Sequence, residues 1–436
     1  MQISAKSTAG YTLFLLFLIN FFNFFDRAIP SAVLEPLRKE FSLTDTNLGV
    51  LTTAFTLIYA FAGIPLGRLS DRFPRKRILA IGVAVWSGMT AVSGMAGSFA
   101  AFFLARMGVG IGEASCSPAS NAMIGDLYPA AKRARAIGIF MLGLPIGSLA
   151  CFGLVGWIAQ HYGWRAPFLL ASIPGFILAV LLWRLVEPVR GSQESYQVDQ
   201  SQPVANPYRK ILSVPTIWWI IISGASFNFA SYSISTFLAA MLSRYHGLSL
   251  AEAGGIVAIV IGATGIVSLT AGGWLADAMH RRFARGRLLL GAACLLMAAP
   301  LAWLGLQQPL GQVVTLTVLM SAGWLLFYMY YVTVYSSLQD VVEPRLRGTA
   351  MAVYFFFMTV LGGGLGTFVT GALSDFYASQ MMAAEGLTEI TASIRALGLR
   401  SALSLAVPIA IGITGIALCF ASRTFVRDTQ KLRVAG

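Results

Sequence analysis

The chain has 436 residues, of which 57% are hydrophobic and 11% are charged. Charged residues make up about 25% of an ordinary soluble domain, so this composition excludes a soluble globular protein. Apolar stretches of about 18 residues or more recur along the whole length, and each could cross a bilayer as a helix. The sequence therefore predicts an all-α membrane protein with twelve transmembrane helices. The stretches expected to span the membrane are 10–32, 46–68, 77–98, 100–124, 133–158, 166–186, 214–241, 252–277, 286–306, 311–338, 348–376 and 401–422.

The basic residues that give the formal net charge of +13 are distributed unevenly along the chain. With the N-terminus inside, 23 of the 31 lysines and arginines fall in cytoplasmic segments, 6 fall outside and 2 lie within spans. An excess of basic residues in cytoplasmic loops sets the orientation of a membrane protein. We therefore expect both termini to be cytoplasmic, in a plasma membrane of the bacterial inner-membrane type, and we expect no nucleic-acid partner.

Residues typical of metal, redox and acid–base chemistry are few and scattered. The 4 cysteines are isolated within spans, without metal or redox spacing, and the 3 histidines fall at the edges of loops. A membrane acyltransferase would need a histidine within the spans. We therefore expect no enzyme activity, no metal and no cofactor. A channel is also disfavoured, because a pore would need polar residues across both halves of the chain.

Nearly all of the full charges that can be placed deep within the expected spans lie in two segments. The first segment carries Asn23, Asp26 and Arg27 near its end, and the fourth carries Arg106 and Glu113. The latter two are seven residues apart, or about two helical turns, so they project from one face. A charge at membrane depth costs roughly 2.5–3.5 kcal/mol unless it is compensated. We expect the four charged residues, called the charge quartet below, to form a functional site, with permanent salt bridges as the structural alternative.

The loop between segments 2 and 3 is basic and contains one acid. Its sequence is Gly67-Arg-Leu-Ser-Asp71-Arg72-Phe-Pro-Arg75-Lys76-Arg77. Asp71 is placed to cap the next helix, and the basic residues hold the loop on the cytoplasmic side. We expect a cytoplasmic gate made of Gly67, Asp71, Arg72, Arg75 and Lys76.

Two motifs recur at nearly constant spacing, which indicates a duplication. A degraded copy of the basic loop runs from Gly273 to Arg282, 206 residues after the first. The stretch from Asp126 to Ala136 resembles the stretch from Asp340 to Ala350, 214 residues later. This spacing fits two parallel halves of six helices. The predicted domains are an N-terminal six-helix bundle over 1–187, a cytoplasmic linker over 188–212 and a C-terminal six-helix bundle over 213–436.

The second half offers one polar residue and one aromatic face as site candidates. Asn228 is its clearest polar residue in mid-span, and it either binds substrate or joins two helices. Trp324, Tyr328 and Tyr331 are spaced along one helical face. Aromatic faces usually belong to the core, and the alternative is a cavity wall that contacts an apolar ligand.

The whole chain resembles the major facilitator superfamily of transporters, whose signature loop has the form G-x-x-x-D-R-x-x-R-[KR]. Asp26-Arg27, Arg106 with Gly-Ile-Gly-Glu113-Ala-Ser, and Ile124-Gly-Asp126-Leu-Tyr-Pro129 resemble its spinster branch. Spinster proteins are twelve-helix, proton-linked transporters of lysophospholipids and sphingosine phosphate. The resemblance implies that Asp26 and Glu113 bind the coupling proton and that both arginines contact an anionic head group. The anion:cation symporter branch, which carries sugar acids and other small organic anions, has a similar quartet and stays open.

The placement of the charges favours an amphiphilic substrate. An intramembrane carboxylate can be neutralised by a proton or by an arginine, and exchange between these partners couples substrate to proton. The second half carries no comparable charge in mid-span, so a cavity would be polar on one side and apolar on the other. We therefore expect a monomeric, proton-coupled transporter in the lipid bilayer. It would move an anionic lipid by alternating access, with small organic anions such as sugar acids as the alternative.

Overall fold

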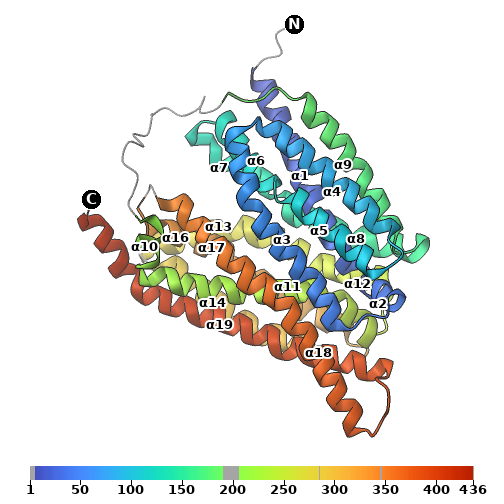
Figure 1. Cartoon of the computed structure of the whole chain (residues 1–436). Coiled ribbons are helices and arrows are strands. Elements are labelled where there is room, and N and C mark those ends of the chain that lie inside the picture. Colours follow the sequence, from blue (N-terminus) through green and yellow to red (C-terminus); the bar gives the residue numbers. More distant parts are fainter. Residues whose placement is uncertain (1–4, 190–205, 284, 344–345, 436) are drawn as a thin grey trace. The chain divides into compact units, whose positions relative to one another are not determined.

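The computed structural model describes residues 5–189, 206–283, 285–343 and 346–435, and the elements in these ranges are helices (Figure 1). In the N-terminal part the helices are α1 Ala5–Ala32, α2 Leu34–Glu40, α3 Asp45–Arg72, α4 Arg75–Met95, α5 Phe99–Glu113, α6 Cys116–Leu127, α7 Ala130–Met141, α8 Gly143–Tyr162 and α9 Ala166–Arg184. In the C-terminal part they are α10 Pro207–Leu212, α11 Pro215–Tyr245, α12 Leu250–Val257, η1 Ala258–Ala263, α13 Thr264–Arg282, α14 Gly286–Leu306, α15 Val313–Phe327, α16 Met329–Asp340, α17 Arg347–Phe357, η3 Met358–Gly364, α18 Leu365–Ala384 and α19 Ala392–Ala435.

The predicted all-α membrane fold is confirmed. Eleven helical stretches of the described chain are long and apolar enough to cross a membrane. The twelfth expected segment is α11, which has 31 residues but contains several serines and Asn228, and these lower its hydropathy. By length and composition, eleven of the twelve predicted transmembrane helices are therefore found in the described chain, and α11 is the one that does not qualify.

The described chain divides into two compact units. The first comprises Met1–Ser42, Ala54–Gln202 and Leu250–Ala258, and the second comprises Leu43–Thr53, Pro203–Ser249 and Ile259–Gly436. Helix α3 therefore begins in the second unit and continues in the first, while α12 is grouped with the first. Residues 190–205 of the predicted linker lie outside the described residues, so the predicted domain boundaries stay a prediction.

Several long helices are interrupted, and proline explains two of the interruptions. Pro118 and Pro145 have no N–H to donate to the carbonyl four residues earlier, on Ala114 and Met141 respectively. Helix α5 ends at Glu113, immediately before the first of these carbonyls, and α7 ends at Met141, which carries the second. A break therefore follows Glu113 directly, so this residue ends a helix at membrane depth.

Close helix approach in the first unit depends on glycine. A Cβ on Gly112 of α5 would lie 2.7 Å from both the Gly82 oxygen and the Trp86 nitrogen of α4. A Cβ on Gly147 of α8 would lie 2.4 Å from the Phe21 oxygen of α1. Small residues allow such backbone contacts between membrane helices. These contacts fix α1 and α5, the two helices that carry the charge quartet.

Candidate functional site

The structure brings the charge quartet together as two ion pairs in the first unit. The Arg27 Nε lies 2.6 Å from the Glu113 Oε2, and the Arg106 Nη1 lies 3.2 Å from the Asp26 Oδ1. Asp26, Arg106 and Glu113 are 3%, 2% and 0% exposed. Each arginine thus compensates an acid on the other helix, which is how a low-dielectric interior can hold four charges.

The carboxylate of Asp26 has hydrogen-bond donors on both of its oxygens. Thr90 of α4 donates from Oγ1 to Oδ2 at 2.5 Å, and Arg106 occupies Oδ1. Arg106 also donates from Nη2 to the backbone oxygen of Asp26 at 3.5 Å. Both oxygens of this buried carboxylate therefore have a partner. Sequence reasoning missed Thr90, because a threonine in an apolar helix carries no signal of its own.

The carboxylate of Glu113 is satisfied on one oxygen only. Its Oε2 accepts from Arg27, whereas Oε1 is buried without a hydrogen-bond partner among the described residues. The buried amide nitrogen of Asn23 likewise has no partner there. A buried polar atom without a partner is costly and calls for an explanation such as a transient ligand or proton. The two acids of the quartet are therefore not equivalent.

Three aromatic rings lie over the guanidinium of Arg27, and one of them is shared with Arg106. The Arg27 Cζ is 4.0 Å from the ring centroid of Tyr59, 5.3 Å from that of Phe24 and 5.8 Å from that of Phe55. The Arg106 Cζ is 5.4 Å from the centroid of Phe55. These separations lie within the range of cation–π interaction. Sequence reasoning did not select Phe55 or Tyr59.

In the second unit Asn228 has a structural partner. Its Nδ2 donates to the Met358 oxygen of η3 at 3.1 Å, and a Cβ on Gly362 would lie 2.3 Å from the Ala225 oxygen. A π-helical segment leaves backbone carbonyls out of the α-helical pattern, and the asparagine satisfies one of them. This contact matches the expected alternative in which Asn228 joins two helices, and its predicted contact with substrate stays a prediction.

The aromatic face of α15 and α16 is layered. Trp324 is 0% exposed and stacks on Phe327 at 4.8 Å, and Tyr328 is 6% exposed. Tyr331 is partly exposed and stacks on Tyr328 at 6.0 Å. Of the three aromatic residues predicted to contact substrate, Tyr331 is the most exposed, and Trp324 packs in the core of the unit.

The comparison with known proteins assigns the family. The family model described as Major Facilitator Superfamily matches residues 16–367. The chain belongs to the Major Facilitator Superfamily. Members of this superfamily are transporters, so the predictions of an integral membrane transporter and of no enzyme are confirmed.

Individual relatives divide among several substrates. An MFS-type efflux pump of Mycolicibacterium smegmatis is 31% identical over 363 residues, which is 83% of each chain. A hexuronate transporter of Bacillus subtilis is 26% identical over 83% of this chain and 86% of its own. A crystal structure of a bacterial homolog of the human lysosomal transporter Spinster, inward-facing and unoccupied, has a TM-score of 0.86 and 29% identity. It covers 97% of this chain and 98% of its own, which confirms the resemblance to spinster proteins.

The superfamily signature loop forms ion pairs and backbone caps where the structure describes it. Arg75 pairs with Asp126 of α6, and Lys76 donates from Nζ to the Leu185 oxygen. Gly67 lies near the end of α3, where its oxygen accepts from Ser70 Oγ at 2.6 Å. The side chains of Asp71 and Arg72 lie outside the described residues, so the predicted gate stays a prediction.

An acid at the end of the predicted N-terminal bundle caps helix α4. The carboxylate of Glu187 accepts from the backbone nitrogens of Arg75 and Lys76, at 2.7 and 3.1 Å. These are the first two residues of the helix, whose N–H groups have no partner within it. The cap joins the end of the first six-helix bundle to its signature loop.

We expect Glu187→Ala to destabilise the protein by about 1 kcal/mol, the usual cost of a lost N-terminal cap. Glu187→Gln should lose less, because its amide oxygen can still accept one of the two N–H groups. Thermal unfolding of the purified protein in detergent would measure both changes. Equal midpoints for wild type and Glu187→Ala would show that the cap contributes nothing.

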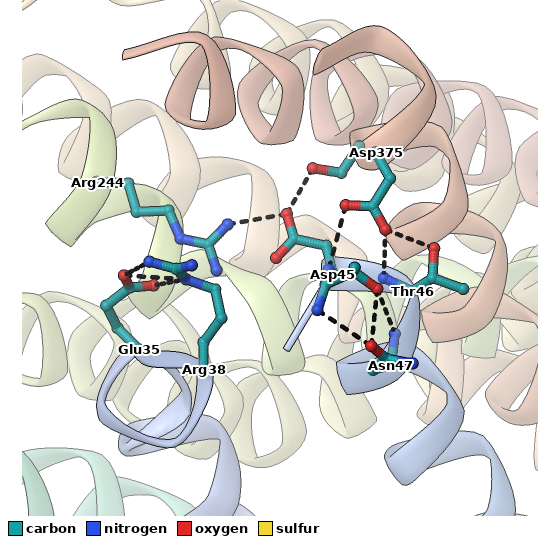
Figure 2. A network of polar contacts seen from close by, with 9 residues as sticks. Glu35, Arg38, Asp45, Thr46, Asn47, Arg244 and Asp375 are labelled. Atoms are coloured by element: carbon teal, nitrogen blue, oxygen red, sulfur yellow. Dashed lines mark hydrogen bonds and ion pairs between the residues drawn. The ribbon is translucent and has the colours of Figure 1, made fainter. Parts of the chain in front are cut away.

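A second buried charge network lies in the second unit and was not expected from the sequence (Figure 2). The Oδ2 of Asp45, the first residue of α3, accepts from Arg244 Nη1 at 2.8 Å and from Ser374 Oγ at 2.6 Å. The carboxylate of Asp375 accepts from the backbone nitrogens of Asp45 and Thr46, at 3.2 and 2.8 Å. Asp375, which lies on α18, therefore caps the N-terminus of α3. Asp45 and Arg244 lie at the ends of α3 and α11, whereas Ser374 and Asp375 lie within α18.

Proposed function

We propose that this protein is a proton-coupled secondary transporter of an anionic amphiphile, such as a lysophospholipid or a sphingosine-phosphate-like lipid. It works by alternating access as a monomer in a plasma membrane, with both termini in the cytoplasm. The observation that carries the proposal is the charge quartet, in which two buried ion pairs lie side by side on α1 and α5. Its arginines supply the positive charge that an anionic head group needs.

Coupling follows from the competition for each arginine. When an anionic head group binds Arg27, Glu113 loses the charge that compensates it. A buried carboxylate without compensation binds a proton rather than stay ionised. When the anion leaves, Arg27 pairs again with Glu113 and the proton is released. Substrate and proton are thereby linked through one side chain, without a separate proton path.

Asp26 and Glu113 have different roles in this proposal. Asp26 has donors on both oxygens and keeps Arg106 in place as a fixed positive charge. Glu113 has one oxygen without a donor among the described residues, and this oxygen can take the proton without breaking a hydrogen bond. We therefore assign the coupling proton chiefly to Glu113 and a supporting protonation to Asp26.

The lipid character of the substrate rests on the contrast between the two units. The second unit also holds buried charges, Asp45 and Arg244, but they lie at the ends of α3 and α11. Its partly exposed aromatic residue Tyr331 is proposed to contact the acyl chain, in front of the buried Trp324 and Tyr328. An arginine pair with an aromatic surface suits a charged head and an apolar tail.

A small organic anion is the second candidate, and the hexuronate transporter of Bacillus subtilis favours it. A sugar acid needs the same arginines for its carboxylate but has no tail. Its hydroxyl groups would require polar partners, which the aromatic face of the second unit supplies only through tyrosine hydroxyls. The two candidates therefore predict different affinities. A lipid site should bind longer chains more tightly, whereas a sugar-acid site should discriminate between hydroxyl patterns.

Binding of an acyl-chain series of lysophosphatidates, measured beside galactonate and glucuronate, tests the proposal. Each buried methylene contributes roughly 0.8 kcal/mol, so affinity should rise steeply with chain length until the cavity is full. Arg27→Ala should weaken every lipid of the series, whereas Tyr331→Ala should weaken long chains more than short ones. Affinity that does not vary with chain length, together with clear binding of a sugar acid, would show that the substrate is a small organic anion and not a lipid.

A further inference from the structure

We propose that Phe55 and Tyr59 of α3 are positioning residues for the quartet, and that their rings hold the guanidinium groups of Arg27 and Arg106 ready for an anionic head group. The proposal rests on the proposed function, because it assumes that these arginines bind the substrate's anion. It adds α3 to the site that α1 and α5 form, and it assigns a role to two residues with no charge.

The geometry shows how one helix serves both arginines. Phe55 and Tyr59 are four residues apart, so they lie one above the other on the same face of α3. Tyr59 is 4.0 Å from the Arg27 Cζ, and Phe55 is 5.8 Å from it and 5.4 Å from the Arg106 Cζ. Phe55 is therefore common to the two ion pairs.

A glycine on α5 faces the shared ring. Gly110 lies four residues after Arg106 and three before Glu113, on the face that carries both charges. A Cβ at this position would lie 3.4 Å from two ring carbons of Phe55. Phe55 therefore lies next to the face of α5 that carries the two charged side chains.

The rings and the carboxylates use different parts of the guanidinium group. Its five N–H donors lie in the plane, whereas an aromatic ring contacts its face. Arg27 can therefore donate to Glu113 at 2.6 Å and stack on Tyr59 at the same time. When an anion replaces the carboxylate, the ring contact persists. While the anion replaces the carboxylate, the arginine keeps its orientation, and the ring continues to stabilise part of its positive charge.

Binding of three probes to matched variants tests this role. The probes are a lysophosphatidate, galactonate and an uncharged monoacylglycerol with the same chain as the lysophosphatidate. Tyr59→Leu should weaken both anions about tenfold, which corresponds to roughly 1.4 kcal/mol and lies within the range of desolvated cation–π contacts. Tyr59→Phe keeps the ring and should stay within about twofold of wild type. The uncharged probe should bind all three proteins alike.

Phe55→Leu is the second variant, and it should weaken the anions at least as much because it removes the ring that both arginines share. Phe61→Leu on the same helix is the matched control, since Phe61 is 57% exposed and follows Tyr59 by two residues, which places it about 200° around the helix from Tyr59. Full anion affinity in both leucine variants would overturn the proposal. So would equal losses in Tyr59→Phe and Tyr59→Leu, or an equal loss for the uncharged probe.

A measurement without ligand separates this proposal from the proposed function. In protein labelled with 15N-arginine, the Nε–H signal of Arg27 can be assigned by its loss in Arg27→Lys. Its exchange with water should be about tenfold faster in Tyr59→Leu and unchanged in Tyr59→Phe, because the ring shields and orients the group. Unchanged exchange in Tyr59→Leu overturns the positioning role. If wild type binds neither anion while the exchange behaves as expected, the substrate assignment fails and the positioning role stands.

Discussion

Glu113→Gln is expected to abolish transport driven by a pH gradient in proteoliposomes while leaving the protein nearly as stable as wild type. The glutamine imitates the protonated acid, and Oε1 of Glu113 has no hydrogen bond to lose among the described residues. Arg27 loses the negative charge of its partner, but its side chain is 16% exposed and keeps the rings of Tyr59 and Phe55. Lysophosphatidate binding should therefore survive in part, without any dependence on the gradient.

Asp26→Asn provides the contrasting result. It should also abolish gradient-driven transport, but it should destabilise the protein by about 3–5 kcal/mol because it leaves Arg106 buried without a countercharge. The NH2 group that replaces one carboxylate oxygen accepts no hydrogen bond, so one of the two donors, Thr90 or Arg106, loses its acceptor. Glu40→Gln, in the half-exposed pair with Arg165, serves as the control and should transport normally. If both Glu113→Gln and Asp26→Asn respond to the gradient as wild type does, the coupling proton binds at another site.

Arg244→Ala is expected to destabilise the protein by about 3–5 kcal/mol, because it leaves the carboxylate of Asp45 buried without its countercharge. Asp45 is 0% exposed and Arg244 donates to it at 2.8 Å. The loss should appear as a lower unfolding midpoint of the purified protein in detergent. Arg165→Ala removes an ion pair that is 39% exposed on both sides, and it should change stability by less than about 1 kcal/mol.

The double variant Arg244→Met with Asp45→Leu distinguishes two free energies. One is the stability that the ion pair contributes, and the other is the cost of leaving one charge buried without its partner. Apolar residues of similar volume often replace a buried ion pair with little loss, so the double variant should recover much of the stability that Arg244→Ala loses. Its transport should stay altered if the pair also helps to set the conformation. Equal stability of Arg244→Ala and wild type would contradict the account of this network.

Sequence reasoning reached the quartet because charges at membrane depth are rare and demand partners. Asp26 and Arg27 lie next to each other and Arg106 and Glu113 two turns apart, so their pairing across α1 and α5 followed from helical geometry. The same reasoning could not choose which acid pairs with which arginine. That choice depends on the rotation of the two helices, which the glycine contacts set.

The parts of the site that were missed carry no signal in one sequence. Thr90 and Tyr59 look like ordinary members of apolar helices, and their contacts with Asp26 and Arg27 appear only once α3 and α4 are in place. Asp45 and Arg244 are 199 residues apart and lie at helix ends, where charged residues are common. Burial, which distinguishes them, is a property of the fold.

The π-helical segment η3, Met358–Gly364, has a consequence for how relatives of this protein should be aligned. A π-helical turn arises when a helix accommodates one residue more than the α-helical pattern holds. Deleting one glycine of Gly362-Gly363-Gly364 would remove this extra residue and restore the α-helical pattern. Thr367, Thr370 and Ser374 of α18 would then keep the neighbours they have now, whereas a deletion within the regular α18 would turn everything after it by about 100° about the helix axis. A relative without this turn should therefore show its one-residue gap within 358–364, and a gap placed farther along α18 would pair residues that face different neighbours.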